Sequence, residues 1–254
     1  MFIDAHAHLD DEAFDKDRDE VLKKIKESGI HVINAGSDID SSAFSLKLAR
    51  EHDFIYACVG VHPHDSERAP KDYLDTLYEM AKAQKVLAIG EIGLDYHYDF
   101  SEREIQKRVF REQLALAKEM DLPVVVHSRE AHQDTLDIIK KSGISRGLMH
   151  CYSGSVELAQ EYIKLGFYFS LGGAITFKNA KKPKESAARL PLERILLETD
   201  CPYLTPEPFR GRRNDPTNIP IIARAMAELR GISVEEIEKA IEENTRRLFG
   251  IILL

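Results

Sequence analysis

Histidines and carboxylates that could bind metal ions follow short apolar segments along this chain of 254 residues. Six of them are the strongest candidates: His6, His8, Glu91, His127, His150 and Asp200. A carboxylate at the end of a buried segment is costly unless it is paired or coordinates a cation. Four imidazoles and two carboxylates form a mixed nitrogen and oxygen set, which suits Zn²⁺, Mn²⁺ and similar ions better than Ca²⁺. The residue types and positions therefore predict a metal site.

The pair His6 and His8 is informative only together with the other candidates. The two residues are separated by one position, and on a strand this spacing points both imidazoles to the same face. An isolated pair of this kind is as readily explained by surface histidines at a strand end. The remaining candidates each end a different apolar segment, which packing does not explain, and this favours metal ligation.

The same residues indicate what reaction the site would perform. Six protein ligands shared by two cations leave coordination positions open for water and substrate. Glu91 is the candidate for a bridging carboxylate, and Asp200 is expected to bind a cation, to take the proton from the attacking water, or to do both in turn. The predicted chemistry is metal-assisted hydrolysis.

The candidate ligands depend on a regular series of strands to bring them together. Eight short apolar segments are expected to be strands, namely residues 1–5, 30–35, 54–61, 86–89, 122–126, 147–149, 167–171 and 194–197. Amphipathic segments with helical spacing separate them, which is typical of a parallel sheet covered by helices. No GxGxxG turn follows the first segment, and eight strands suit a closed sheet better than an open Rossmann-like one. We therefore predict a (β/α)8 TIM barrel with its active site at the C-terminal strand ends.

Length and composition agree with this architecture. One such barrel takes roughly 250 residues, and no linker divides the chain, so a single domain is expected over residues 1–254. A net charge of −8 argues against broad electrostatic binding of nucleic acid by the protein surface. Any polyanion would therefore be bound by a local basic patch. No two of the three cysteines form a CxxC pair, so a disulfide framework is not expected. The N-terminus does not resemble a signal peptide and no apolar run is long enough for a membrane span, so we expect a cytoplasmic location. We also expect a monomer.

Motifs along nearly the whole chain identify a family resemblance. They occur in the order DAHAHLD, GVHPH, IGEIGLDYH, PVVVHSR, MHCYSG, ETDCPYLTP, FRGRRND and ENTRRLFG. In this combination the sequence closely resembles the TatD-family metal-dependent deoxyribonucleases of the amidohydrolase superfamily. The resemblance implies a (β/α)8 barrel and hydrolysis of DNA phosphodiesters, including 3′ to 5′ removal of nucleotides from single strands.

The resemblance also implies how the ligands divide between two divalent cations, which would be Mg²⁺, Mn²⁺ or Zn²⁺. It places one cation among His6, His8, Glu91 and Asp200, and the other among Glu91, His127 and His150. His62, in the GVHPH motif, would act on the substrate phosphate or the attacking water, and the alternative is a structural histidine. With His62, the catalytic candidates are Glu91 and Asp200.

Other residues are candidates for binding a DNA substrate. Arg129 can offer a bidentate guanidinium to phosphate oxygens, and the alternative is a salt bridge to a nearby carboxylate. Arg212 and Arg213 lie in a cationic run after the last predicted strand, where they could meet a phosphate backbone. Tyr203 could stack on a base or line the wall. Asp95 is expected to orient a metal-binding histidine or to hold its loop.

Two other function classes compete with the nuclease. An amidohydrolase-type enzyme, including a deacylase of aminoacylated RNA, would use the same cations on C–N or ester bonds. The arginines argue against a neutral amide substrate, and no lysine that could be carbamylated ends a predicted strand. A metal-binding interaction protein is the third possibility, and open coordination positions argue against it. Cys151 and Cys201 adjoin ligands and are expected to face away from the site.

Overall fold

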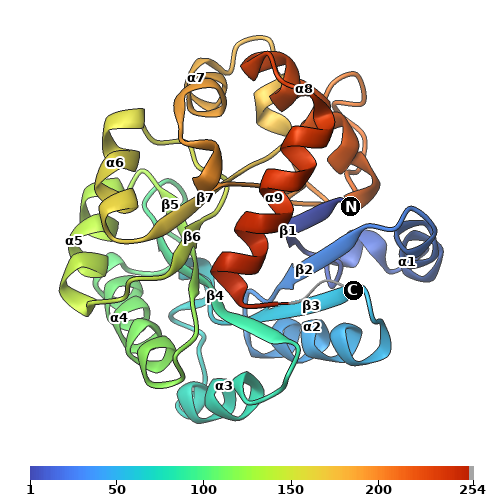
Figure 1. Ribbon diagram of the computed structural model, residues 1–254. Coiled ribbons are helices and arrows are strands. Elements are labelled where there is room, and N and C mark those ends of the chain that lie inside the picture. Colours follow the sequence, from blue (N-terminus) through green and yellow to red (C-terminus); the bar gives the residue numbers. More distant parts are fainter. Residues whose placement is uncertain (252–254) are drawn as a thin grey trace.

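Strands and helices alternate along the computed structural model, which describes residues 1–251 (Figure 1). Eight strands form one sheet in chain order, and each neighbouring pair is parallel. The strands are β1 (Ile3–Ala7), β2 (His31–Ala35), β3 (Ile55–Val59), β4 (Val86–Asp95), β5 (Val124–Arg129), β6 (Gly147–Met149), β7 (Phe167–Leu171) and β8 (Ile195–Leu197). This arrangement confirms the predicted (β/α)8 barrel.

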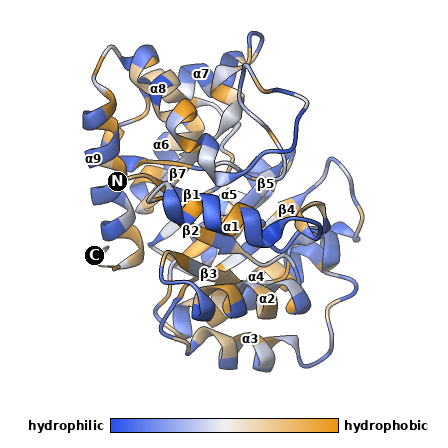
Figure 2. Ribbon diagram, turned by 90° about the vertical axis from the view of Figure 1, so that its right-hand side faces the viewer, coloured by the Kyte–Doolittle hydropathy of each residue, from blue (hydrophilic) through white to orange (hydrophobic). Residues whose placement is uncertain are grey.

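Helices cover the outside of the sheet. They are α1 (Arg18–Glu27), α2 (Ile39–Glu51), α3 (Tyr73–Ala81), α4 (Arg103–Glu119), α5 (His132–Ser142), α6 (Val156–Lys164), α7 (Lys181–Arg189), α8 (Ile219–Arg230) and α9 (Val234–Phe249). Figure 2 shows hydrophobic colour on β3 and hydrophilic colour on much of α1, as expected when strands are buried and helices have one face in water. None of the described helices combines the length and hydrophobicity needed to cross a lipid bilayer.

The first and last strands meet at the mouth of the barrel, where the predicted ligands lie. The backbone N–H of Asp200 donates to the carbonyl of His6 at 3.0 Å, and the N–H of His8 donates to the carbonyl of Cys201 at 2.9 Å. These two hydrogen bonds tie the segment after β8 to β1. Residues nearly 200 positions apart in the sequence are therefore fixed side by side.

The opposite opening is closed by apolar side chains. Ile33, Val125 and Leu148 pack inside the barrel in one cluster with Leu248 and Phe249, which belong to α9. Figure 1 shows α9 lying across this opening. Since side chains of the described residues fill this end of the barrel, a site is expected at the C-terminal mouth.

Strand β4 is longer than the sequence pattern predicts. It was expected to end at Ile89, and it continues to Asp95 because its backbone keeps pairing with β5, as between Gly93 and His127. Gly93 has a φ of 143°, and a Cβ there would lie 2.0 Å from the carbonyl oxygen of His127. A glycine at this position is therefore required for β5 to approach. The extension places Glu91 within the strand.

Candidate metal centre

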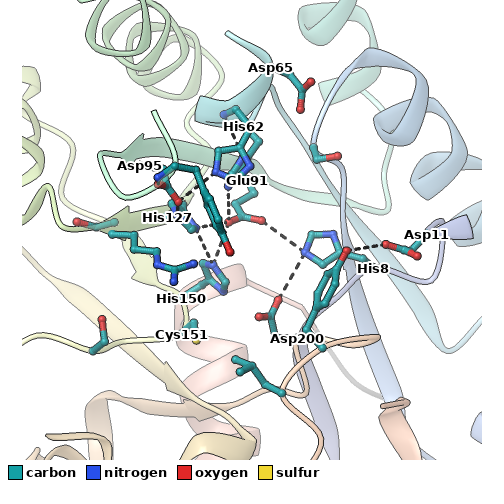
Figure 3. A pocket seen from close by; sticks show the side chains of 18 of the residues that line it. His8, Asp11, His62, Asp65, Glu91, Asp95, His127, His150, Cys151 and Asp200 are labelled. Atoms are coloured by element: carbon teal, nitrogen blue, oxygen red, sulfur yellow. Dashed lines mark hydrogen bonds and ion pairs between the residues drawn. The ribbon is translucent and has the colours of Figure 1, made fainter. Parts of the chain in front are cut away.

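The six predicted ligands converge at the C-terminal mouth of the barrel. His6, Glu91 and His127 lie within β1, β4 and β5. The other three follow strands, with His8 after β1, His150 after β6 and Asp200 after β8. A cavity of about 800 Å³ opens over them, and Figure 3 shows the side chains of five of them pointing toward its centre, namely His8, Glu91, His127, His150 and Asp200. This volume is within the range of ligand pockets in enzymes.

One oxygen of Glu91 faces side chains from the first and last strands. Its Oε2 lies 3.2 Å from Nε2 of His6 and 3.5 Å from Nε2 of His8. Those two nitrogens are 3.1 Å apart, and Oδ1 of Asp200 lies 3.6 Å from Nε2 of His8. We refer to His6, His8 and Asp200 as the β1/β8 group.

The other oxygen of Glu91 faces a different set of histidines. Its Oε1 lies 2.9 Å from Nε2 of His150, 3.0 Å from Nδ1 of His127 and 3.4 Å from Nε2 of His62. We refer to these three residues as the β3/β5/β6 group, after the strands that precede or contain them. Figure 3 shows Glu91 between the two groups. The carboxylate thus presents one oxygen to each group.

The spacing between these atoms fits divalent cations. Bonds of about 2.0–2.2 Å in tetrahedral or octahedral geometry place neighbouring ligand atoms about 3.0–3.5 Å apart. Three sets of potential ligand atoms lie within 4.8 Å of one another: His6, Glu91 and His150; His6, His8 and Asp200; and His62, Glu91 and His127. Imidazoles and carboxylates meeting at these distances form a mixed donor set, in which the imidazoles suit Zn²⁺ and the carboxylates suit Mn²⁺ or Mg²⁺.

Charges within the site favour an ionised carboxylate among neutral and protonated imidazoles. Burial opposes ionisation of Glu91, but the histidines around it hold its pKa well below the usual value. Burial lowers the pKa of His62 to about 4, so this imidazole is neutral, and its Nδ1 accepts the backbone N–H of His64 at 3.2 Å. Burial also disfavours the charged form of His8, yet Asp200 and Glu91 raise its pKa to about 9. A divalent cation would replace that proton.

Carboxylates lie behind two rings of the β3/β5/β6 group. Oδ2 of Asp95 lies 2.9 Å from Nε2 of His127, as predicted for an orienting partner. The same oxygen lies 3.1 Å from Nε2 of His64. Oε2 of Glu198 lies 3.5 Å from Nδ1 of His150, and its Oε1 accepts the N–H of Cys151 at 2.7 Å. Outer carboxylates of this kind fix the tautomer and direction of a metal-binding imidazole.

Two residues near the site, His64 and Glu198, are not among the candidates predicted from the sequence. Glu198 is fully buried and stands two positions before Asp200, so the alternation of a strand would have placed both on one face. His64 stands two positions after His62, but it lies in a short 3₁₀ helix (Pro63–Asp65), where that periodicity does not hold. Only the signal for Glu198 was therefore available in the sequence.

Left-handed backbone conformations occur next to two of the strand ends. Asp200 has a φ of 54° and Cys151 a φ of 44°, both unusual for residues other than glycine. The prediction that Cys151 faces away from the site is wrong, because it lines the cavity. Its positive φ ends the alternation of strand side chains. Cys201 is buried in the core, as predicted.

The predicted substrate contacts divide into two kinds. Arg129 and Tyr203 line the cavity. No ion pair within 4.0 Å involves Arg129 among residues 1–251, and its guanidinium lies 4.8 Å from the ring centre of Tyr98. Tyr203 is 57% exposed, and its hydroxyl donates to Asp11 at 2.9 Å. Both side chains are placed where a substrate could reach them.

Arg212 and Arg213 are not brought to the cavity. The guanidinium of Arg213 donates to both carboxylate oxygens of Asp17 at 2.7 Å and to the carbonyl of Ala13 at 2.6 Å. Arg212 is exposed, and its guanidinium lies 5.5 Å from the ring centre of Phe209. The cationic run predicted from the sequence thus lies outside the cavity lining, and one of its charges is neutralised.

Comparisons with known proteins cover almost the entire chain. Residues 3–250 match the family model described as TatD related DNase. A metal-dependent hydrolase of Bacillus subtilis, YabD, whose name calls it uncharacterized, is 46% identical over 99% of this chain and 100% of its own length. The 3′-5′ ssDNA/RNA exonuclease TatD of Klebsiella pneumoniae is 33% identical over 98% of each chain. The crystal structure of YjjV, a TatD homologue of Escherichia coli, superposes with a TM-score of 0.93 at 34% identity, covering 99% of this chain and 98% of the other.

Proposed function

This chain belongs to the TatD-related DNase family and is a metal-dependent hydrolase acting on ester bonds, and from that premise we propose that it removes nucleotides from the 3′ end of single-stranded DNA. The position of the Glu91 carboxylate is the main support for the proposal, because its two oxygens face two separate groups of potential ligands. A carboxylate in this position is suited to bridging two cations on which a phosphodiester is held. One relative of this chain is named as an exonuclease of single-stranded DNA and RNA.

The proposed ligands follow the two groups. The β1/β8 group and Glu91 would hold one divalent cation, and Glu91 with His127 and His150 would hold the other. Mg²⁺, Mn²⁺ and Zn²⁺ are the candidates, since the imidazoles favour Zn²⁺ and the carboxylates with bound water favour Mg²⁺ and Mn²⁺. When bound, such cations polarise phosphoryl oxygens and acidify water. The chain itself supplies the ligands and their orientation.

Other side chains would act on the substrate directly. Asp200 lies at the edge of the cavity with its pKa held below the usual value against the opposing effect of burial, through its bond to His8 and nearby histidines. It is therefore ionised and able to accept the proton of an attacking water. Arg129, which has no carboxylate partner among residues 1–251, would contact a phosphate oxygen. His62 is neutral and faces Glu91, which suits it to position that water.

We further propose that residues 1–254 form one barrel domain acting as a monomer. All the proposed cation ligands come from this single chain. No residue of a second copy is needed to complete the arrangement around Glu91.

Single-stranded DNA labelled at its 5′ end tests the activity and its direction. With Mn²⁺ or Mg²⁺, the protein is expected to shorten the labelled strand stepwise, and a chelator should stop the reaction. Asp200→Asn should lose most of this activity without a change in fold. Asp17→Asn is the matched control, since Asp17 is a carboxylate outside the cavity that pairs with Arg213.

The same preparation should be compared on RNA, aminoacylated RNA and amide substrates. Faster hydrolysis of an aminoacyl ester or an amide than of DNA would favour the amidohydrolase or deacylase alternative. Full activity of Asp200→Asn on DNA would contradict the proposed role of that carboxylate.

A further inference from the structure

Two aromatic side chains are held in solvent beside the cavity. Tyr98 and Phe100 lie in the loop between β4 and α4 and are 48% and 65% exposed. Burying rings of this size is normally favourable by about 25 cal/mol for each Å² of apolar surface. Their exposure therefore needs an explanation other than local packing.

Polar contacts fix the loop that carries these rings. Oδ1 of Asp95 accepts the backbone N–H groups of His97 and Tyr98, each at 2.9 Å. The hydroxyl of Ser101 donates to the carbonyl of His64 at 2.9 Å. Asp95 also orients His127 through its other oxygen. The exposed rings are thus built on the same carboxylate that supports the candidate metal centre.

The rings form a stack that leads out of the cavity. The ring centres of Tyr98 and Phe100 are 5.1 Å apart, with an angle of 14° between the planes. The guanidinium of Arg129 lies 4.8 Å from the centre of the Tyr98 ring. Tyr98 and Arg129 line the cavity together with Glu91, whereas Phe100 lies beyond the lining. A cation and two aromatic rings therefore extend from the candidate metal centre to the solvent.

This combination suits an unpaired nucleotide. A nucleobase released from its partner strand can stack on an aromatic face, and a guanidinium can bind the adjoining phosphate. We propose that Tyr98 and Phe100 form a platform for an unpaired nucleobase of the substrate strand, with Arg129 on the neighbouring phosphate. This inference rests on the proposed nuclease function and gives its preference for single strands a physical basis, since bases inside a duplex are already stacked and paired.

Binding measurements test the platform without relying on hydrolysis. Single-stranded decanucleotides with a 5′ fluorescein and phosphorothioate linkages, which slow hydrolysis, are titrated with the Mn²⁺-loaded protein, and fluorescence anisotropy gives Kd. One oligonucleotide carries all its bases, and three others are abasic at one of the last three 3′ positions. A fifth carries 2-aminopurine at the position where the missing base weakens binding most, because quenching of that base reports stacking.

The wild-type protein should bind the complete strand about tenfold more tightly than one of the abasic strands, as expected for a single stacked base. Phe100→Leu and Tyr98→Leu should remove this difference and the quenching of 2-aminopurine. Phe209→Leu is the matched control because Phe209 is another exposed phenylalanine, 38% accessible and outside the cavity lining. It should bind like the wild type.

Two outcomes separate the platform from the nuclease function. If the wild type hydrolyses unmodified DNA but binds complete and abasic strands equally, the platform is wrong and the function stands. If the wild type discriminates between the strands and hydrolyses no DNA, the function is wrong and the platform stands. Unchanged discrimination in both leucine variants would also overturn the platform.

Discussion

The two sides of the candidate metal centre differ in how their ligands are supported. In the β3/β5/β6 group, outer carboxylates face the imidazole rings, since Asp95 contacts His127 and Glu198 contacts His150. In the β1/β8 group the ring of His8 has a neutral partner, the carbonyl of Ala35 at 3.0 Å. The outer carboxylate on that side is Asp4, which is fully buried.

Asp4 supports the backbone instead of a ring. Its Oδ1 accepts the N–H of His6 at 3.3 Å and the N–H of Thr199 at 2.8 Å. It therefore holds β1 against the segment after β8, near the two backbone hydrogen bonds that join the same segments. The β1/β8 group already contains the carboxylate Asp200, whereas the β3/β5/β6 group has only imidazoles besides the shared Glu91. Negative charge therefore reaches the two sides in different ways. Asp200 belongs to the β1/β8 group itself, whereas Asp95 and Glu198 act through the imidazole rings of the β3/β5/β6 group.

Substitution of Glu91 should have the largest effect because this residue belongs to both sides. Glu91→Gln is expected to lose both cations and to reduce phosphodiester hydrolysis by about 10³-fold or more, which corresponds to roughly 4 kcal/mol in the transition state. Elemental analysis of the purified variant gives the number of bound cations. Two retained cations would show that the carboxylate does not bridge the groups.

Substitution of Asp200 should affect one side only. Asp200→Asn is expected to weaken binding of the cation at the β1/β8 group and to leave binding of the other cation unchanged. The reason is that Asp200 contacts His6 and His8 and none of the β3/β5/β6 histidines. Calorimetric titration with Mn²⁺ should then show one tight site, with activity lowered by about 10² to 10³-fold. Equal weakening of both sites would remove the distinction between the groups.

The outer carboxylates should have smaller effects that follow the same division. Asp95→Asn and Glu198→Gln are expected to lower cation affinity by about 10- to 100-fold at the β3/β5/β6 group. Asp4→Asn is the contrasting variant, since its amide oxygen can still accept the two backbone N–H groups, and the Mn²⁺ affinity should stay near that of the wild type. A loss of affinity in Asp4→Asn as large as that in Asp95→Asn would contradict the comparison.

The sequence could predict the barrel and the convergence of the ligands because both follow from local periodicity. Apolar segments spaced by amphipathic helices indicate parallel strands, and parallel strands bring their C-terminal ends to one mouth. The expected positions of six ligand-type residues at that mouth agree with the structure, as for His127 in β5 and Asp200 after β8. The extension of β4 was missed because Gly90 and Gly93 interrupt its apolar pattern, although the pairing with β5 continues.

The roles of the arginines could not be predicted because they depend on long-range partners. Nothing near Arg213 in the sequence indicates that Asp17, about 200 positions away, neutralises it. The platform was missed for a related reason, since Tyr98 and Phe100 are separated from Arg129 by a helix and a strand. Charge and aromatic content can be counted in a sequence, whereas the pairing of these side chains is set by the closed barrel.

The smallest expected effects distinguish the arginines on the two sides of the mouth. Arg129, at the end of β5, faces the cavity without an ion pair among residues 1–251, whereas Arg213, after β8, is bound to Asp17. Arg129→Ala is therefore expected to raise KM for single-stranded DNA about tenfold, as for the loss of one charge-assisted hydrogen bond to phosphate. Arg213→Ala should change KM by less than about twofold, because Arg213 does not line the cavity. Its exposed ion pair contributes only about 0–1 kcal/mol to stability. Steady-state kinetics on one oligonucleotide compare the two variants, and a larger effect of Arg213→Ala would place the phosphate path on the β8 side instead.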